Sequence, residues 1–266
     1  MGNFLILKYI KKIMNNTFNL INKQNCKSIC KKIFNIFFKK NENNYSIDKY
    51  KNLSTEQVFT KIYKDGVWGK SKDKNQLFFS GSGSHTPFIV TTYVDAVQEF
   101  LFSFKQKPSV VDLGCGDFSV GSKIRHLCCR YIACDIVKPV IKFNKKKYKN
   151  MDVEFKILDI TKDELPEGDV VFIRQVLQHL SNDQINSVLP KILSKYKYMV
   201  LTEHLPSSEK FIHNVDKKAG PDIRLDINSG LVLTSAPFDI KIKEECCLCE
   251  VEEIGGIIRT ILYRLS

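Results

Sequence analysis

Two glycines and three aspartates stand at the ends of consecutive apolar segments, at spacings that suit one ligand site. Asp112 ends the first segment and is followed by Gly114 and Gly116. Glycines at such a place let the backbone approach a ligand closely and turn sharply into a helix. Asp135, nineteen residues beyond Gly116, and Asp159 end the next two segments. We expect Asp135 to accept hydrogen bonds from ribose hydroxyls and Asp159 to reach an adenine edge. The alternative is that all five are ordinary turn residues.

Alternating β and α segments would position these residues. Apolar, β-prone runs occupy residues 109–113, 131–134, 153–158, 170–173 and 198–202. Helical patterns separate several of them, at 120–128, 137–148 and 182–195. This alternation predicts a parallel sheet with right-handed crossovers, whose carboxyl strand ends meet at one crevice. Two further β-rich runs, 240–251 and 257–265, predict an antiparallel pair that closes the sheet.

The segment VVDLGCGDFSVG (110–121) resembles motif I of class I S-adenosylmethionine-dependent methyltransferases. Its DxGxG pattern differs from the GxGxxG of nicotinamide enzymes, because the third glycine is missing in that register. The segments VFIRQVLQHLS and IIRTILYRL fit the same family, so the resemblance extends from about residue 109 to the C-terminus. The predicted fold class is therefore α/β. We expect a Rossmann-like methyltransferase sheet, mostly parallel with an antiparallel C-terminal strand pair, plus an N-terminal helical leader.

The same resemblance implies S-adenosylmethionine as the cofactor. Asp112 and Gly114 would flank its methionine portion, Gly116 would lie at the ribose, and Gln175 would line the cofactor near the sulfonium. Asp159 and Ile160 would be the adenine pair. The predicted cofactor-binding residues are Asp112, Gly114, Cys115, Gly116, Asp135, Asp159, Ile160 and Gln175.

For methyl transfer from a sulfonium, the protein has mainly to bring the two reactants together and orient them, because the methyl group is already activated. An oxygen nucleophile would benefit from a base. His179 and His204 follow the fourth and fifth predicted strands at one rim of the sheet, and Glu203 is either a base or the group that orients His204. These three are the predicted catalytic residues. The alternative for each histidine is a structural hydrogen bond at a helix start or loop.

A long insertion, 205–230, lies between the fifth strand and the terminal pair, on the acceptor side of the predicted site. Long ordered loops in compact domains are often functional. Asp222 and Arg224 in this insertion are the predicted substrate-binding residues, since arginine suits a carboxylate or phosphate. The alternative is a structural Asp–Arg pair that pins the loop.

The first fifth of the chain differs in character from the rest. Residues 1–50 hold ten lysines against Glu42 and Asp48, so they contribute +8 of the net charge of +12. Apolar and lysine positions alternate with helical spacing over 1–40, which predicts a basic amphipathic helical leader followed by a linker. Such a segment can lie in a membrane interface or dock on a partner. It can equally pack on its own domain or form a loosely ordered leader.

The rest of the chain, 55–266, is predicted to be one methyltransferase domain. Within it, 55–108 would supply N-terminal helices and a glycine- and serine-rich loop at 80–84. This loop is either a linker or a lid that folds over the bound ligand.

The amino-acid composition narrows the cellular compartment and the classes of partner that we expect. The nine cysteines include no CxxC pair, and their odd number argues against a closed disulfide framework, so we expect reduced thiols, a cytoplasmic protein and no metal site. The early apolar run 4–7 is too short for an export signal or a membrane span. No nucleic-acid partner is expected, because the basic charge is concentrated in the leader and no RNA-binding motif accompanies it.

The predicted function is methyl transfer from S-adenosylmethionine to a small polar acceptor, such as a sugar or another metabolite. Two alternatives remain at this point. One is an NAD-dependent oxidoreductase, which shares the strand–glycine–helix pattern. The other is a non-catalytic cofactor-binding adaptor that docks through residues 1–40, the segment that also offers a peripheral membrane contact.

Overall fold

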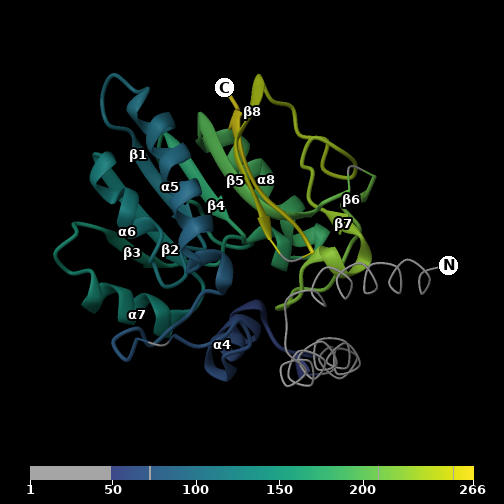
Figure 1. Ribbon diagram of the computed structural model, residues 1–266, viewed down its shortest axis with the longest axis horizontal. Helices are drawn as coiled ribbons and strands as arrows, with labels where there is room; N and C mark the ends of the chain where they lie inside the picture. Colours follow the sequence, from purple (N-terminus) through teal and green to yellow (C-terminus); the bar gives the residue numbers. More distant parts are fainter. Residues whose placement is uncertain (1–48, 72, 209, 254) are drawn as a thin grey trace, which may run out of the picture. The chain divides into compact units, whose positions relative to one another are not determined.

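The computed structural model describes residues 49–71, 73–208, 210–253 and 255–266. Contacts within the chain divide it into two units, Met1–Asn52 and Leu53–Ser266, and the second carries the fold shown in Figure 1. The predicted leader at 1–40 lies outside the described residues, so its role stays a prediction. None of the described helices is long and apolar enough to cross a membrane.

A seven-stranded sheet forms the centre of the described part of the chain, in the order β3-β2-β1-β4-β5-β9-β8. Strands β1 to β5 pair in parallel, and β9 runs antiparallel to both β5 and β8. The bounds are β1 Ser109–Leu113, β2 Arg130–Asp135, β3 Glu154–Ile157, β4 Val170–Arg174, β5 Tyr198–Pro206, β8 Glu244–Glu253 and β9 Gly256–Arg264. The predicted mostly parallel sheet with an antiparallel C-terminal pair is confirmed.

Helices cover both faces of this sheet, because its central strands are apolar on both sides. Their bounds are α4 Thr55–Asp65, α5 Pro87–Phe102, α6 Gly121–Ile124, α7 Lys138–Lys147 and α8 Asn182–Lys195. Val111 packs with Ile185 and Ile192 of α8 in one core cluster. Its neighbour Val110 packs with Val97 of α5 in the other cluster, as expected when successive strand residues point to opposite faces.

Helix α4 begins at a capping box. The Ser54 hydroxyl accepts a hydrogen bond from the Gln57 backbone N–H, and the Gln57 side chain accepts one from the Ser54 N–H. Gly66 ends the helix in the left-handed conformation at φ 65°. Phe59 and Tyr63 stand four residues apart and therefore share the helix face that meets the site described below.

Strand β5 is longer than predicted. The apolar pattern predicts an end at residue 202, but β5 continues to Pro206 because residues 203–206 pair with the start of β9, up to Pro206 opposite Gly256. A Cβ at Gly256 would lie 2.1 Å from the Leu205 carbonyl oxygen, so only glycine allows this close pairing. Glu203 and His204 consequently lie inside the sheet ladder instead of at its rim.

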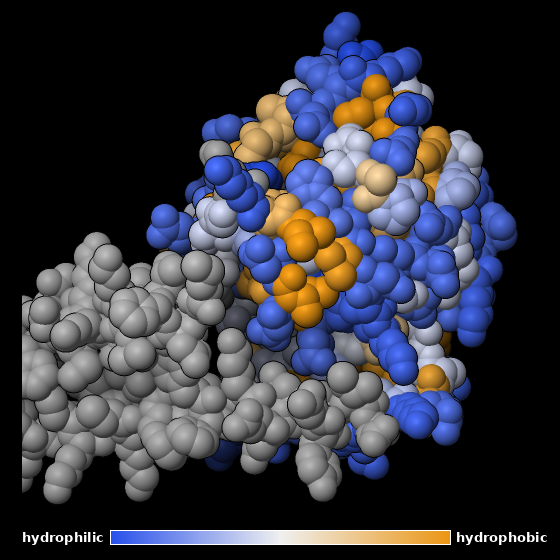
Figure 2. Space-filling model, turned by 90° about the vertical axis from the view of Figure 1, so that its right-hand side faces the viewer, coloured by the Kyte–Doolittle hydropathy of each residue, from blue (hydrophilic) through white to orange (hydrophobic). Residues whose placement is uncertain are grey.

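Arg224, which is 1% exposed, stabilises the insertion after β5. Its guanidinium donates to the carbonyl oxygens of Val215, Gln178 and Leu180 and to Oδ1 of Asn182. The insertion also contains the short parallel pair β6 Ile212–His213 and β7 Ser229–Gly230. Figure 2 shows apolar patches on this side of the molecule within a mainly hydrophilic surface.

Candidate functional site

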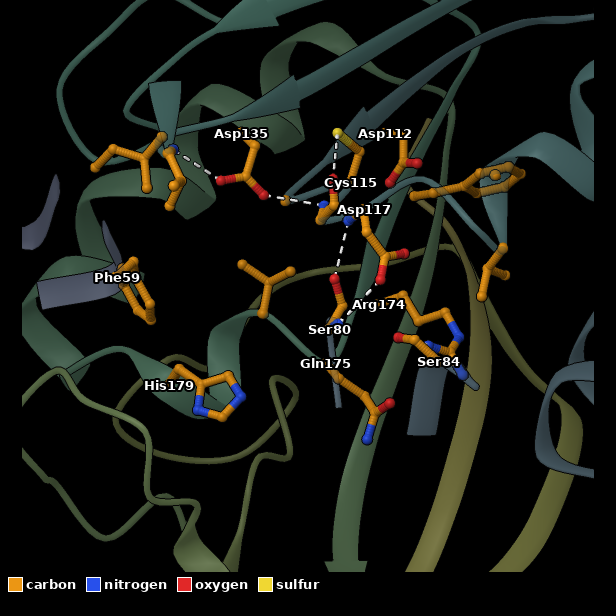
Figure 3. A pocket seen from close by; sticks show the side chains of 18 of the residues that line it. Phe59, Ser80, Ser84, Asp112, Cys115, Asp117, Asp135, Arg174, Gln175 and His179 are labelled. Carbon is orange, nitrogen blue, oxygen red and sulfur yellow. Dashed lines mark hydrogen bonds between the residues drawn. The ribbon is translucent and has the colours of Figure 1, made fainter. Parts of the chain in front are cut away.

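A cavity lies at the carboxyl ends of the parallel strands, where the sheet order changes direction between β1 and β4. Open α/β sheets bind ligands at this point. Figure 3 shows Asp135 on one side of the cavity, and Asp112 and Arg174 on the other. All eight residues predicted to bind the cofactor line it: Asp112, Gly114, Cys115, Gly116, Asp135, Asp159, Ile160 and Gln175.

The turn after β1 requires glycine at both predicted positions. Gly114 has φ 80° and Gly116 has φ 53°, values that other residues adopt only with strain. A Cβ at Gly114 would lie 2.4 Å from a methyl carbon of Val176, and one at Gly116 would lie 2.5 Å from the Ser80 hydroxyl oxygen. The glycines therefore let the segment after β4 and the loop at 80–84 pack tightly against this turn.

Asp135 ends β2 and holds the turn in place. Its Oδ2 accepts a hydrogen bond from the Gly116 N–H at 3.0 Å, and its Oδ1 accepts one from the Val137 N–H at 2.9 Å. Burial raises the pKa of this carboxyl to about 6, while these backbone hydrogen bonds act in the opposite direction. Each carboxylate oxygen keeps further acceptor capacity, which suits the two hydroxyls of a ribose.

Asp112 lies in β1, the strand next to β2, and is buried. Its Oδ2 accepts a hydrogen bond from the Tyr131 hydroxyl at 3.0 Å. Burial raises its pKa to about 7, and the Tyr131 hydrogen bond counteracts this increase. Figure 3 shows Asp112 on the opposite side of the cavity from Asp135.

Asp159 and Ile160 follow β3 on the side of Asp135. Asp159 Oδ1 accepts hydrogen bonds from the N–H and the hydroxyl of Thr161, at 3.0 Å and 2.6 Å, which fixes the loop. Ile160 is buried, and Ile136, which follows Asp135, also lines the cavity. An acid beside two apolar side chains suits a planar ring with polar edges such as adenine.

The loop at 80–84 packs against the glycine motif through a network of hydrogen bonds that the sequence did not predict. The Ser80 N–H donates to Asp117 Oδ2 at 3.0 Å, and the Asp117 N–H donates to the Ser80 hydroxyl at 2.9 Å. His85 Nε2 lies 2.6 Å from the same Oδ2, and the Tyr63 hydroxyl lies 2.9 Å from the Ser80 hydroxyl. Burial acts to raise the pKa of Asp117, but the His85 hydrogen bond and charge outweigh it and the pKa is lowered. The only sequence signal was Asp117 directly after the motif glycine.

Arg174, the last residue of β4, is a second residue that the sequence did not single out. It lines the cavity and stacks over the Tyr93 ring, with its guanidinium carbon 4.9 Å from the ring centroid. Its two terminal nitrogens donate to the Ser84 hydroxyl and the Gly83 carbonyl oxygen. The next residue, Gln175, has φ 55°, and its N–H donates to the Thr202 carbonyl oxygen at 2.7 Å. Strand β4 ends at Arg174, and the side chains of Arg174 and Gln175 both lie beside Gly83 of the loop at 80–84.

Among the three predicted catalytic residues, the cavity includes His179 alone. His179 Nδ1 lies 3.2 Å from the Gly220 carbonyl oxygen, and its ring lies 5.0 Å from that of Trp68 and 6.4 Å from that of Phe59. Burial lowers its pKa to about 3, so the imidazole is neutral at physiological pH. It can accept a hydrogen bond there but has little driving force as a general base.

Glu203 and His204 are buried in β5 and are not among the residues that line the cavity. Burial raises the pKa of Glu203 to about 8, and the nearby Arg224 charge acts in the opposite direction. The pKa of His204 is lowered by burial. The structure therefore gives neither side chain access to a ligand in this cavity.

The predicted acceptor-binding pair is also absent from the cavity lining. Asp222 is exposed, and the described residues include no ion pair between Asp222 and Arg224. The contacts of Arg224 with three backbone carbonyls favour the alternative, a residue that pins the insertion, although its partners are carbonyls and Asn182 instead of Asp222.

Comparisons with known proteins agree with this geometry. Residues 110–197 match the family described as "Methyltransferase domain". The fold is similar to that of N-methyltransferase NodS from Bradyrhizobium japonicum WM9 in complex with S-adenosyl-L-homocysteine, with a TM-score of 0.57 and 12% identity over 78% of this chain and 98% of that chain. It is also similar to magnesium protoporphyrin IX methyltransferase from Synechocystis PCC 6803 with bound S-adenosylmethionine, with a TM-score of 0.51 and 14% identity over 80% of this chain and 99% of that chain. A search of curated proteins finds no match.

Proposed function

We propose that this chain, a class I S-adenosylmethionine-dependent methyltransferase by its fold and by the match of residues 110–197, methylates a small polar acceptor, with a sugar as the first candidate. The observation that supports S-adenosylmethionine as the cofactor is the convergence of three strand-end acids on one cavity. Asp135 suits the ribose, Asp159 suits the adenine edge, and Asp112 suits the amino-acid end. S-adenosylmethionine supplies an activated methyl group, so the residues of this chain have mainly to bind and orient the reactants.

The acceptor proposal rests on the aromatic wall of the same cavity. This wall consists of Phe59, Tyr63, Trp68 and His179, all of which line the cavity. The Trp68 ring lies 6.1 Å from that of Phe59 and meets that of Tyr63 edge-on at 5.3 Å. Amphipathic ring faces beside a few polar groups suit a small acceptor with one apolar face and several hydroxyls, as in a sugar.

His179 is the residue of this wall that we propose to orient an acceptor hydroxyl. Its Nδ1 faces the Gly220 carbonyl, so the proton belongs on Nδ1 and the lone pair on Nε2. Gln178 Nε2 lies 3.4 Å from that Nε2 and competes weakly for the lone pair. A neutral imidazole in this position accepts a hydrogen bond from a hydroxyl and excludes bulk water, without carrying a charge.

The cellular compartment of the protein and its peripheral contacts are also part of the proposal. The seven cysteines of the described part of the chain are free thiols, in keeping with a reducing compartment such as the cytoplasm. A peripheral membrane or partner contact through residues 1–40 is proposed on their basic amphipathic pattern alone.

The test is transfer of a labelled methyl group from S-adenosylmethionine into chromatographic fractions of source-cell extract and into a panel of free and nucleotide-linked sugars. Asp135→Asn serves as the impaired variant, and Asp95→Asn, at an exposed position on α5, serves as the matched control. We expect label in a polar small-molecule fraction with the wild-type protein and Asp95→Asn, but much less with Asp135→Asn. Label found only in protein or nucleic acid would contradict the proposed acceptor class.

A further inference from the structure

We propose that Asn144 of helix α7 is a positioning residue for the cofactor site, which acts through the Gly116 backbone to hold Asp135 in the orientation that receives the ribose. This inference rests on the proposed function and deepens it. Asn144 lies within α7 and is not among the residues that line the cavity, so it acts on a ligand only through other groups.

The backbone of Gly116 is held on both sides by buried side chains. Its carbonyl oxygen accepts a hydrogen bond from Asn144 Nδ2 at 2.7 Å, and its N–H donates to Asp135 Oδ2 at 3.0 Å. Asn144 is fully buried, so water does not compete with the amide for the carbonyl oxygen. Glycine has the greatest backbone freedom of all residues, so the directions of the Gly116 N–H and carbonyl depend on such contacts.

Helix α7 closes a ring of contacts around Asp135. The second carboxylate oxygen, Oδ1, accepts a hydrogen bond from the N–H of Val137, the N-cap residue of α7, and Figure 3 shows both hydrogen bonds of this carboxylate. The helix therefore holds Asp135 directly at its N-terminus and, through Asn144 and Gly116, at its second turn. Both oxygens keep a fixed direction, which recognition of two adjacent ribose hydroxyls requires.

A second contact from α7 fixes the next residue of the turn. Tyr148 follows Asn144 by four residues, and its hydroxyl donates to the Asp117 carbonyl oxygen at 3.2 Å. Its ring meets that of Phe118 edge-on at 5.1 Å. The carbonyls of Gly116 and Asp117 are thus both bound from the helix, so neither can rotate without breaking a contact with α7.

Stability alone does not account for an amide at position 144. Asn144 Oδ1 is buried and has no hydrogen-bond partner in the described part of the chain, and the other buried residues of α7, Val140 and Ile141, are apolar. A buried acceptor without a partner destabilises the folded state by as much as a typical hydrogen bond stabilises it. The hydrogen bond from Nδ2 is therefore offset in stability, and what remains is the direction that it gives to Gly116.

A double-mutant cycle on the full chain tests the proposal, with the affinity for S-adenosylhomocysteine measured by isothermal titration calorimetry. Asn144→Leu and Asn144→Ala both remove the donor, the first with a similar side-chain volume and the second with a smaller one. We expect both to bind S-adenosylhomocysteine about 5–10-fold more weakly than wild type. In an Asp135→Ala background the same changes should weaken binding by less than about twofold, because Asn144 then has no carboxylate to position. Asn150→Ala, at an exposed position after α7, serves as the control and should bind like wild type.

Urea unfolding of each variant shows whether the protein measured is folded, and either substitution of Asn144 completes the cycle if the other fails to fold. A merely structural role predicts the same loss in both backgrounds. Equal losses in the two backgrounds, or wild-type affinity in the single variants, would overturn the assignment of Asn144. Failure of the wild-type protein to bind S-adenosylhomocysteine would instead contradict the proposed function, so the two failures are distinguishable.

Discussion

At the scale of single residues, burial determines the ionisation of the acids in and beside the site. Asp112 and Asp135 are each 8% exposed, and burial raises their pKa values to about 7 and about 6. Asp135 is nevertheless tied to two backbone N–H groups that favour its charged form. Near neutral pH it is therefore mainly a carboxylate that positions the turn and remains available to a ribose.

The first prediction concerns Asp135. Replacement by Asn keeps the size of the side chain but removes the charge, so S-adenosylhomocysteine binding should weaken by about 1–3 kcal/mol. Titration calorimetry at pH 8, where the wild-type acid is ionised, measures this loss. Asp95→Asn should bind as tightly as the wild-type protein. Unchanged binding by Asp135→Asn would remove Asp135 from the cofactor site.

The second prediction concerns Glu203, a fully enclosed carboxyl whose pKa is raised to about 8. A raised pKa means that the folded state holds the proton more tightly than the unfolded state. The associated stability is complete below the unfolded pKa near 4.3 and is lost as pH rises toward 8. Glu203→Gln removes this titration. Its free energy of unfolding relative to wild type should rise by at most about 1.4 kcal/mol per pH unit between pH 5 and 8, then level off.

Urea unfolding of both proteins at pH 5, 6, 7, 8 and 9 provides the measurement. A stability difference that is constant across this range would show that Glu203 is not held neutral by burial. The same series tests its assignment as a structural side chain, since Glu203→Gln should leave the affinity for S-adenosylhomocysteine unchanged.

At the scale of elements, the site depends on how the loop at 80–84 is fastened to the turn after β1. The fastening residue is Asp117, which is 1% exposed and accepts hydrogen bonds from the Ser80 and Ser119 N–H groups as well as contacting His85. The contacts with Ser80 and His85 join residues more than thirty positions apart in the chain. They turn a sequence that resembles a flexible linker into one wall of the cavity.

The third prediction follows for Asp117→Asn. Loss of the charge weakens the contacts with Ser80 and His85, so amide hydrogen exchange at Ser80 should become about tenfold faster. S-adenosylhomocysteine should restore part of the protection, because the closed loop contributes to the site. Asp95→Asn again serves as the control. Equal exchange at Ser80 in Asp117→Asn and wild type would show that the loop is fastened by other contacts.

At the scale of the whole molecule, the parts predicted from the sequence are those encoded locally. The apolar runs predicted the strands. The site residues Asp112, Asp135 and Asp159 could be predicted because each directly follows or ends such a run. Arg174 could not be found, because its partners Gly83 and Ser84 lie about ninety residues away. Glu203 and His204 were placed wrongly at a rim, because only pairing with β9 shows that β5 extends to Pro206.

The most direct test of the central claim is the shift in melting temperature of the full chain with S-adenosylhomocysteine and with NAD, each at a saturating concentration. A ligand that binds only the folded state raises the melting temperature. We predict a clear rise with S-adenosylhomocysteine, a much smaller rise in Asp135→Asn, and no comparable rise with NAD. Stronger stabilisation by NAD than by S-adenosylhomocysteine would contradict the account and favour a nicotinamide-dependent oxidoreductase.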